Sequence, residues 1–143
     1  MSREVRLTGR VTSGTGAAAR FTALDWFQKA LLQSFGFAPA PGTLNVVLDG
    51  DWHAVDRLLL AAGTVLVPPS TEHCCSILLP ATLGRAHPHV EAVLLRPLVS
   101  GYDPARLEFL APVRLRDVLA VGDGDGVAIA LGPVDGPRWV RLG

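Results

Sequence analysis

Thr43 and Asn45 place a hydroxyl and a carboxamide two residues apart at the start of a short apolar segment. The preceding residues 39–42 read Pro-Ala-Pro-Gly, which predicts a tight turn because proline fixes φ and glycine accepts positive φ. Residues two apart on a strand point to the same face, so we expect the two side chains to lie together. Neutral oxygen ligands suit Mg²⁺, which completes its shell with water and substrate phosphates. The alternative is that both are ordinary polar residues of a turn and a strand edge.

Glu108 is the second residue that could do chemistry. It lies inside the apolar run Leu-Glu-Phe-Leu at residues 107–110, which predicts a strand. A carboxylate in such a place is costly unless it has a partner or binds something. Alternatively, it faces water on the polar side of the strand.

Two segments could hold an anion. Residues 12–20 are mostly small, and their backbone N–H groups could approach a phosphate closely. They match neither a Walker A loop nor a dinucleotide-binding fingerprint. Residues 114–117, Arg-Leu-Arg-Asp, begin a predicted short helix and could contact a phosphate or a base. The alternatives are a plain strand-to-helix loop and a solvated helix face.

The elements that must position these residues are short. Alternating or β-branched runs predict strands at 5–11, 43–48, 64–67, 74–79, 90–95, 107–110, 127–131 and 139–142. Amphipathic patterns predict helices over 24–35, 53–62 and 114–120. Many short strands with a few small helices indicate a mainly β fold, a compact β-barrel, and the missing βαβα alternation argues against a Rossmann fold.

Composition limits the class of protein. The chain has 143 residues, 49% hydrophobic and 18% charged, so we expect one globular domain over residues 1–143. Zero formal net charge argues against a nucleic-acid surface. No run reaches the roughly 18 apolar residues of a membrane span, and residues 1–9 hold no apolar signal core. The only cysteines, Cys74 and Cys75, are adjacent and cannot join distant segments, so we expect reduced thiols in a cytoplasmic protein.

Taken together, four stretches resemble the archaeal-type CTP-dependent riboflavin kinases. They are Gly-x-Val-x-Ser-Gly-x-Gly at 9–16, Gly-Phe-x-Pro-x-Pro-Gly-Thr-Leu-Asn at 36–45, Leu-Glu-x-x-Ala-Pro-x-x-Leu-Arg at 107–116 and the Gly-Asp-Gly turn within 122–126. Their order and spacing cover about residues 5 to 131. The resemblance implies a cradle-loop, RIFT-like barrel of six strands. It also implies the reaction of riboflavin with CTP to give FMN and CDP, with Mg²⁺.

The same resemblance assigns roles to individual residues. Thr43 and Asn45 match the Mg²⁺ ligands. Glu108 matches a flavin-contacting glutamate, and Ser100 falls where a flavin-contacting threonine is expected. For phosphoryl transfer to an alcohol, our hypothesis is that Glu108 orients the acceptor hydroxyl or acts as its general base, which makes it the candidate catalytic residue. The residues that match nucleotide-binding positions are Ser13, Gly14, Thr15, Gly16, Ala17, Ala18, Arg114, Leu115, Arg116 and Asp117.

The chain also departs from the family pattern. Ala17 and Ala18 stand where an acidic residue and a glycine are usual, and residues 99–102, Val-Ser-Gly-Tyr, replace an Arg/Lys-Thr-x-His pattern. Two other functions therefore stay open: a CTP-dependent kinase of another small alcohol, and a non-catalytic flavin- or nucleotide-binding regulatory module. Mg²⁺-dependent nucleotide binding separates a kinase from a flavin-only binder.

Overall fold

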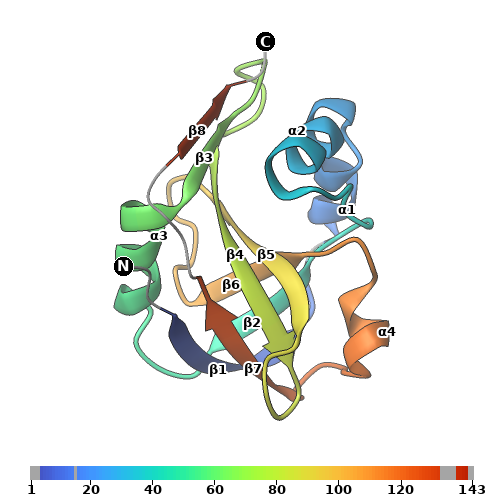
Figure 1. Ribbon diagram of the computed structural model, residues 1–143, viewed down its shortest axis with the longest axis vertical. Helices are drawn as coiled ribbons and strands as arrows, with labels where there is room; N and C mark the ends of the chain where they lie inside the picture. Colours follow the sequence, from blue (N-terminus) through green and yellow to red (C-terminus); the bar gives the residue numbers. More distant parts are fainter. Residues whose placement is uncertain (1–3, 15, 133–137, 142–143) are drawn as a thin grey trace.

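The computed structural model describes residues 4–14, 16–132 and 138–141 (Figure 1). The strands are β1 (Val5–Thr12), β2 (Leu44–Leu48), β3 (Thr64–Val67), β4 (Ser76–Gly84), β5 (Val90–Pro97), β6 (Arg106–Leu110), β7 (Gly126–Leu131) and β8 (Arg138–Arg141). The helices are α1 (Ala17–Thr22), α2 (Asp25–Phe35), α3 (His53–Ala62) and α4 (Leu115–Leu119).

Six strands close into an antiparallel β-barrel. Around the barrel the order is β4, β5, β6, β2, β1 and β7, and β7 pairs back with β4. The mainly β fold and the six-stranded barrel expected from the sequence are therefore confirmed. Outside the barrel, β3 pairs with the first part of β4, and β8 runs parallel to β3 at the top of Figure 1.

Two apolar clusters stabilise the barrel. The larger one contains alternate residues of the barrel strands and also Val55 and Leu59 of α3 and Leu115 and Leu119 of α4. In the smaller one, α2 packs its apolar stripe, centred on Phe27, against residues of β3, β4, β5 and β6. This packing fixes α2 beside the barrel wall (Figure 1). No helix in the described part of the chain is long and apolar enough to cross a membrane.

Two local predictions were wrong. The strand expected at 74–79 begins at Ser76 and continues through Pro80 to Gly84, so Cys74 and Cys75 precede it. Pro80 pairs with Val93 of β5, but its carbonyl faces the opposite side and accepts a hydrogen bond from the Gly132 N–H. The missing N–H of Pro80 faces that side too, at the point where the neighbour of β4 changes from β3 to β7, so no ladder bond is lost. Residues 17–20, the last part of the loop expected at 12–20, lie instead in α1, because alanine is the strongest helix former.

Candidate active site

Thr43 is positioned by the Pro-Gly turn before it, and the turn is anchored by two helices. Gly42 has φ of 86°, a left-handed conformation that favours glycine. Its N–H donates to Thr22 Oγ1 in α1 at 3.0 Å, and Gln28 Nε2 in α2 donates to the carbonyl of Pro39 at 3.0 Å. These side-chain contacts hold the turn against both helices, so the entry into β2 is fixed.

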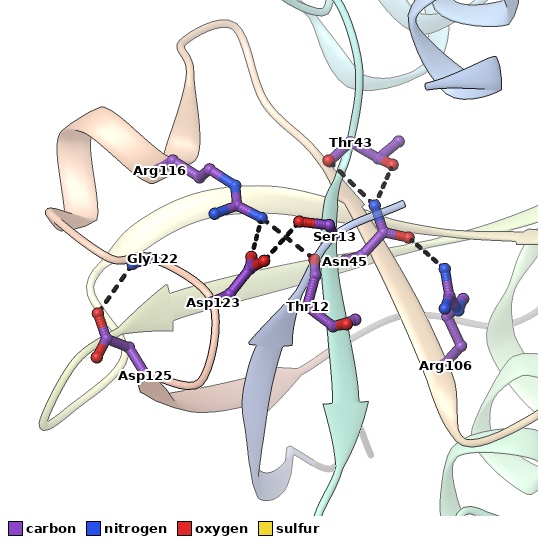
Figure 2. Close-up of polar contacts among 9 residues, drawn as sticks. All are labelled: Thr12, Ser13, Thr43, Asn45, Arg106, Arg116, Gly122, Asp123 and Asp125. Carbon is purple, nitrogen blue, oxygen red and sulfur yellow. Dashed lines mark hydrogen bonds and ion pairs between the residues drawn. The ribbon is translucent and has the colours of Figure 1, made fainter. Parts of the chain in front are cut away.

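Thr43 and Asn45 lie together, as their spacing predicts (Figure 2). Asn45 Nδ2 is 3.4 Å from Thr43 Oγ1, and the Asn45 side chain is buried. On its other side, Asn45 Oδ1 accepts a hydrogen bond from Arg106 Nη1 at 3.3 Å. The carboxamide is thus held between a hydroxyl from the turn and a guanidinium from β6.

Glu108 is directly opposite Asn45 in the β2–β6 ladder. Its Oε1 accepts a hydrogen bond from Thr43 Oγ1 at 2.9 Å, and its Oε2 accepts one from the Tyr102 hydroxyl. Burial of Tyr102 and its hydrogen bond to Glu108 raise the pKa of the phenol above its usual range. Glu108 is therefore a half-buried, partnered carboxylate beside Thr43, and the alternative of a freely solvated residue is excluded.

The end of β1 meets the Gly-Asp-Gly turn at Asp123 (Figure 2). Ser13 Oγ donates to Asp123 Oδ2 at 2.6 Å, and Arg116 Nη2 donates to Asp123 Oδ1 at 2.7 Å and to the carbonyl of Thr12 at 3.2 Å. The hydrogen bond from Ser13, followed by that from Arg116, lowers the pKa of the Asp123 carboxyl. Arg116 is consequently held next to the loop that follows β1.

Gly14 brings its backbone against Asn45. A Cβ added at Gly14 would lie 2.7 Å from Asn45 Nδ2 and 3.2 Å from its Cγ, so this contact requires glycine. Gly16 has φ of 85° and leads into α1, whose first residues are Ala17 and Ala18. Thr15 lies outside the described residues.

Three of the four candidates in the 114–117 segment, Arg114, Leu115 and Arg116, line a small cleft. Arg114 is exposed and pairs with Asp117 at 3.0 Å, whereas Leu115 is buried in the barrel core. The cleft, about 190 Å³, is lined by the turn at residues 40–44 and by residues of the 109–116 segment, including Arg116.

A larger open cleft of about 450 Å³ lies elsewhere, along β1 and the 49–51 and 86–88 segments, and contains none of the candidate residues. We place the site at the smaller cleft because Thr43, Arg114 and Arg116 line it.

The structure does not bring every predicted residue together. Ser100 is exposed in the 98–105 loop, and Tyr102 of that loop is the residue that contacts Glu108. Sequence reasoning missed Arg106, although a position two residues before Glu108 on a strand signals the same face. It also missed the contact of Tyr102 with Glu108, although it had noted that residues 99–102 depart from the family pattern, and the role of Asp123 within a turn that it did recognise.

Replacing Gly14 with alanine is expected to displace Asn45, because the new Cβ overlaps its carboxamide. For the nucleotide-binding role that the sequence predicts for this loop, we expect a loss of turnover on the order of 100-fold, the scale of a misplacement of about 1 Å. The matched control is Gly126→Ala, whose added Cβ meets only the Gly9 carbonyl, at 3.9 Å. Steady-state kinetics and circular dichroism would be measured for both variants. Equal activity of the two folded variants would contradict the prediction.

Comparison with known proteins assigns the family. A family model named CTP-dep_RFKase, with the description "Domain of unknown function DUF120", matches residues 11–131. The chain belongs to the CTP-dependent riboflavin kinase family. Among similar curated members of this family, the riboflavin kinase of Pyrobaculum islandicum is 31% identical over 89% of this chain and 60% of its own length. The riboflavin kinase of Ignicoccus hospitalis is 31% identical over 90% of this chain and 72% of its own length.

Other riboflavin kinases of the family are longer than the matched region to different degrees. The protein of Sulfolobus acidocaldarius is 29% identical over 90% of this chain and 82% of its own length. The chain spans about 60% of the length of the Pyrobaculum relatives that it matches. The matched region nevertheless includes every candidate site residue discussed above.

Proposed function

We propose that this chain phosphorylates riboflavin to FMN, with CTP as phosphoryl donor and Mg²⁺ as cofactor, and releases CDP. The observation that carries the proposal is the convergence of Thr43, Asn45 and Glu108 beside the loop after β1 and Arg116. A phosphoryl-transfer site needs a metal end, an anion-holding loop and an acceptor end within reach of one another. Membership of the riboflavin kinase family supports riboflavin as the acceptor.

The donor groups at the site fit Mg²⁺. The Thr43 hydroxyl and the Asn45 carboxamide are neutral groups that each carry an oxygen, and Thr43 Oγ1 lies 3.4 Å from Asn45 Nδ2. Asn45 Oδ1 faces Arg106, so shared binding of one ion needs a rotation of the amide about its terminal torsion, which is broad. This rotation gives up the hydrogen bond from Arg106, because the amide NH₂ group that then faces the guanidinium cannot accept it. When bound, Mg²⁺ would neutralise charge on the nucleotide phosphates.

The protein groups supply positioning and charge. The Gly14 backbone approaches Asn45 closely, so the loop would hold the phosphates next to the metal ligands. Arg116, held by Asp123 and the Thr12 carbonyl, would stabilise negative charge on the transferred group. Glu108 would orient the acceptor hydroxyl or accept its proton.

The test is incubation of the protein with riboflavin, Mg²⁺ and either CTP or ATP, with FMN measured by chromatography. We expect FMN with CTP and little with ATP. No FMN with either donor, while CTP still binds in the presence of Mg²⁺, would reject riboflavin as the acceptor. FMN with ATP as readily as with CTP would reject CTP specificity.

A further inference from the structure

Tyr102 holds the outer side of the Glu108 carboxylate. It is the only tyrosine in the chain, and its hydroxyl donates to Glu108 Oε2, while the hydroxyl of Thr43 donates to Oε1. Both carboxylate oxygens are thus bound by hydroxyl donors that come from different segments, the turn before β2 and the loop between β5 and β6. A carboxylate held in this way has a single orientation, and each oxygen keeps acceptor capacity for one further donor.

Arg96 on β5 holds the loop that carries Tyr102. Its Nη2 donates to the carbonyl of Pro104 at 2.9 Å, and its guanidinium carbon lies 5.9 Å from the centroid of the Tyr102 ring. Its Nη1 donates to Asp56 of α3 at 2.7 Å. Arg96 therefore links α3 to two points of the 98–105 loop.

The burial of Arg96 indicates more than a packing role. The residue is only 8% exposed, and within the described part of the chain its Nε is a buried donor that no hydrogen-bond partner satisfies. An arginine buried with an unsatisfied donor costs stability compared with an apolar residue of similar volume. What it provides in return is a fixed loop geometry next to Glu108.

We propose that Asp56, Arg96 and Tyr102 are positioning residues that set the orientation of the Glu108 carboxylate and thereby select the acceptor hydroxyl. This inference rests on the proposed phosphoryl transfer to an alcohol at this site. The hydroxyl of the substrate that receives the phosphoryl group donates a hydrogen bond to the Glu108 carboxylate, at a lone pair that Tyr102 and Thr43 leave free. Loosening the loop leaves the carboxylate present but misaligned, so turnover falls while nucleotide binding is kept.

A double-mutant cycle tests the linkage. Tyr102→Phe removes only the hydroxyl, and Arg96→Lys keeps the charge but loses the forked guanidinium geometry. We expect each variant to lower kcat for FMN formation about 10-fold, with KM for CTP unchanged. The double variant should lose no more than the larger single effect, whereas independent roles would multiply to about 100-fold. Multiplying effects, or effects confined to KM for CTP, would overturn the proposal.

Leu98→Ala is the matched control for the loop. Leu98 belongs to the same segment but is 50% exposed and apolar, so its truncation changes the loop surface without removing a hydrogen bond to Glu108 or Arg96. We expect its kcat to equal that of the unmodified protein. If Leu98→Ala lowered kcat as much as Tyr102→Phe does, any change in the loop would have the same effect on turnover, and a specific role of Tyr102 would be overturned.

A titration without any enzymatic assay separates this inference from the proposed function. Because Tyr102 is the only tyrosine, tyrosinate absorbance reports this phenol alone. Burial and Glu108 raise the pKa of Tyr102, whereas Arg96 and Arg106 lower it. Glu108→Gln removes one of the two causes that raise this pKa and keeps both arginines. The midpoint of the titration should therefore move down, toward the ordinary value of about 10. Circular dichroism at each pH separates this titration from unfolding.

The two readouts have distinct consequences. An unchanged midpoint in Glu108→Gln would overturn the contact on which the inference depends. A lowered midpoint in a protein that makes no FMN would reject the proposed function and keep the contact between Tyr102 and Glu108.

Discussion

Glu108→Gln is expected to lower kcat for FMN formation by about 100- to 10,000-fold, the range that a positioned general base contributes. Glutamine keeps the length of the side chain and can still meet the Thr43 and Tyr102 hydroxyls, because a hydroxyl both donates and accepts. What it loses is the negative charge and the capacity to take a proton. Binding of CTP and of riboflavin should therefore change much less than turnover.

The measurement combines single-turnover FMN formation with equilibrium binding of each substrate. Glu91→Gln is a suitable control, since it makes the same chemical change at an exposed position of β5. Full turnover by Glu108→Gln with normal binding would remove the base role. Weakened riboflavin binding with unchanged turnover at saturation would leave Glu108 only an orienting role.

Asn45→Ala is expected to raise the Mg²⁺ concentration needed for half-maximal activity on the order of 100-fold. The loss of an outer-shell partner alone costs a metal site up to about 100-fold in affinity, and we expect the loss of a direct ligand such as Asn45 to reach that value. The substitution also leaves the Arg106 guanidinium without its acceptor. Gln33→Ala, which removes a carboxamide from an exposed position of α2, is the control.

Asn45→Asp separates the metal role from a structural one. Because the two proposed ligands are neutral, the unmodified protein should bind Mg²⁺ weakly until the nucleotide phosphates are present. Aspartate adds a charge at the same position, so Mg²⁺ binding without nucleotide should become tighter. Calorimetric titration with Mg²⁺ measures its affinity for each protein without nucleotide and in the presence of CDP. If the unmodified protein, Asn45→Ala and Asn45→Asp all needed the same Mg²⁺ concentration, Asn45 would be excluded as a ligand.

Local sequence rules predicted the strands and the adjacency of Thr43 and Asn45. These features depend on neighbours in the chain: the period of a strand and the chemistry of a Pro-Gly turn. The same rules placed the boundaries of α2 and α3 within a residue or two, because apolar spacing and a following glycine define them. The barrel followed from the number and length of the strands.

The partners of the site residues could not be predicted from local rules. Arg106 reaches Asn45 only because β6 pairs with β2, although 61 residues separate the two positions. Tyr102 reaches Glu108 through a loop whose shape Arg96 maintains from β5. Non-local strand pairing decides such contacts, and no pattern in a single sequence specifies it. The resemblance to a family supplied candidates for the site but not these contacts.

Because of the β2–β6 pairing, the effect of an insertion on the site depends strongly on where in the chain it occurs. Asn45 and Glu108 are cross-strand partners, and successive residues of a strand alternate between its two faces. A single residue inserted between Leu44 and Asn45 would put the side chains of Thr43 and Asn45 on opposite faces of the strand. One of the two proposed ligands would then point away from Glu108. Several residues added at the exposed 70–72 segment between β3 and β4 would leave this alignment intact. Natural variation in chain length is therefore expected to accumulate in such exposed connections and to be absent from these two short strands.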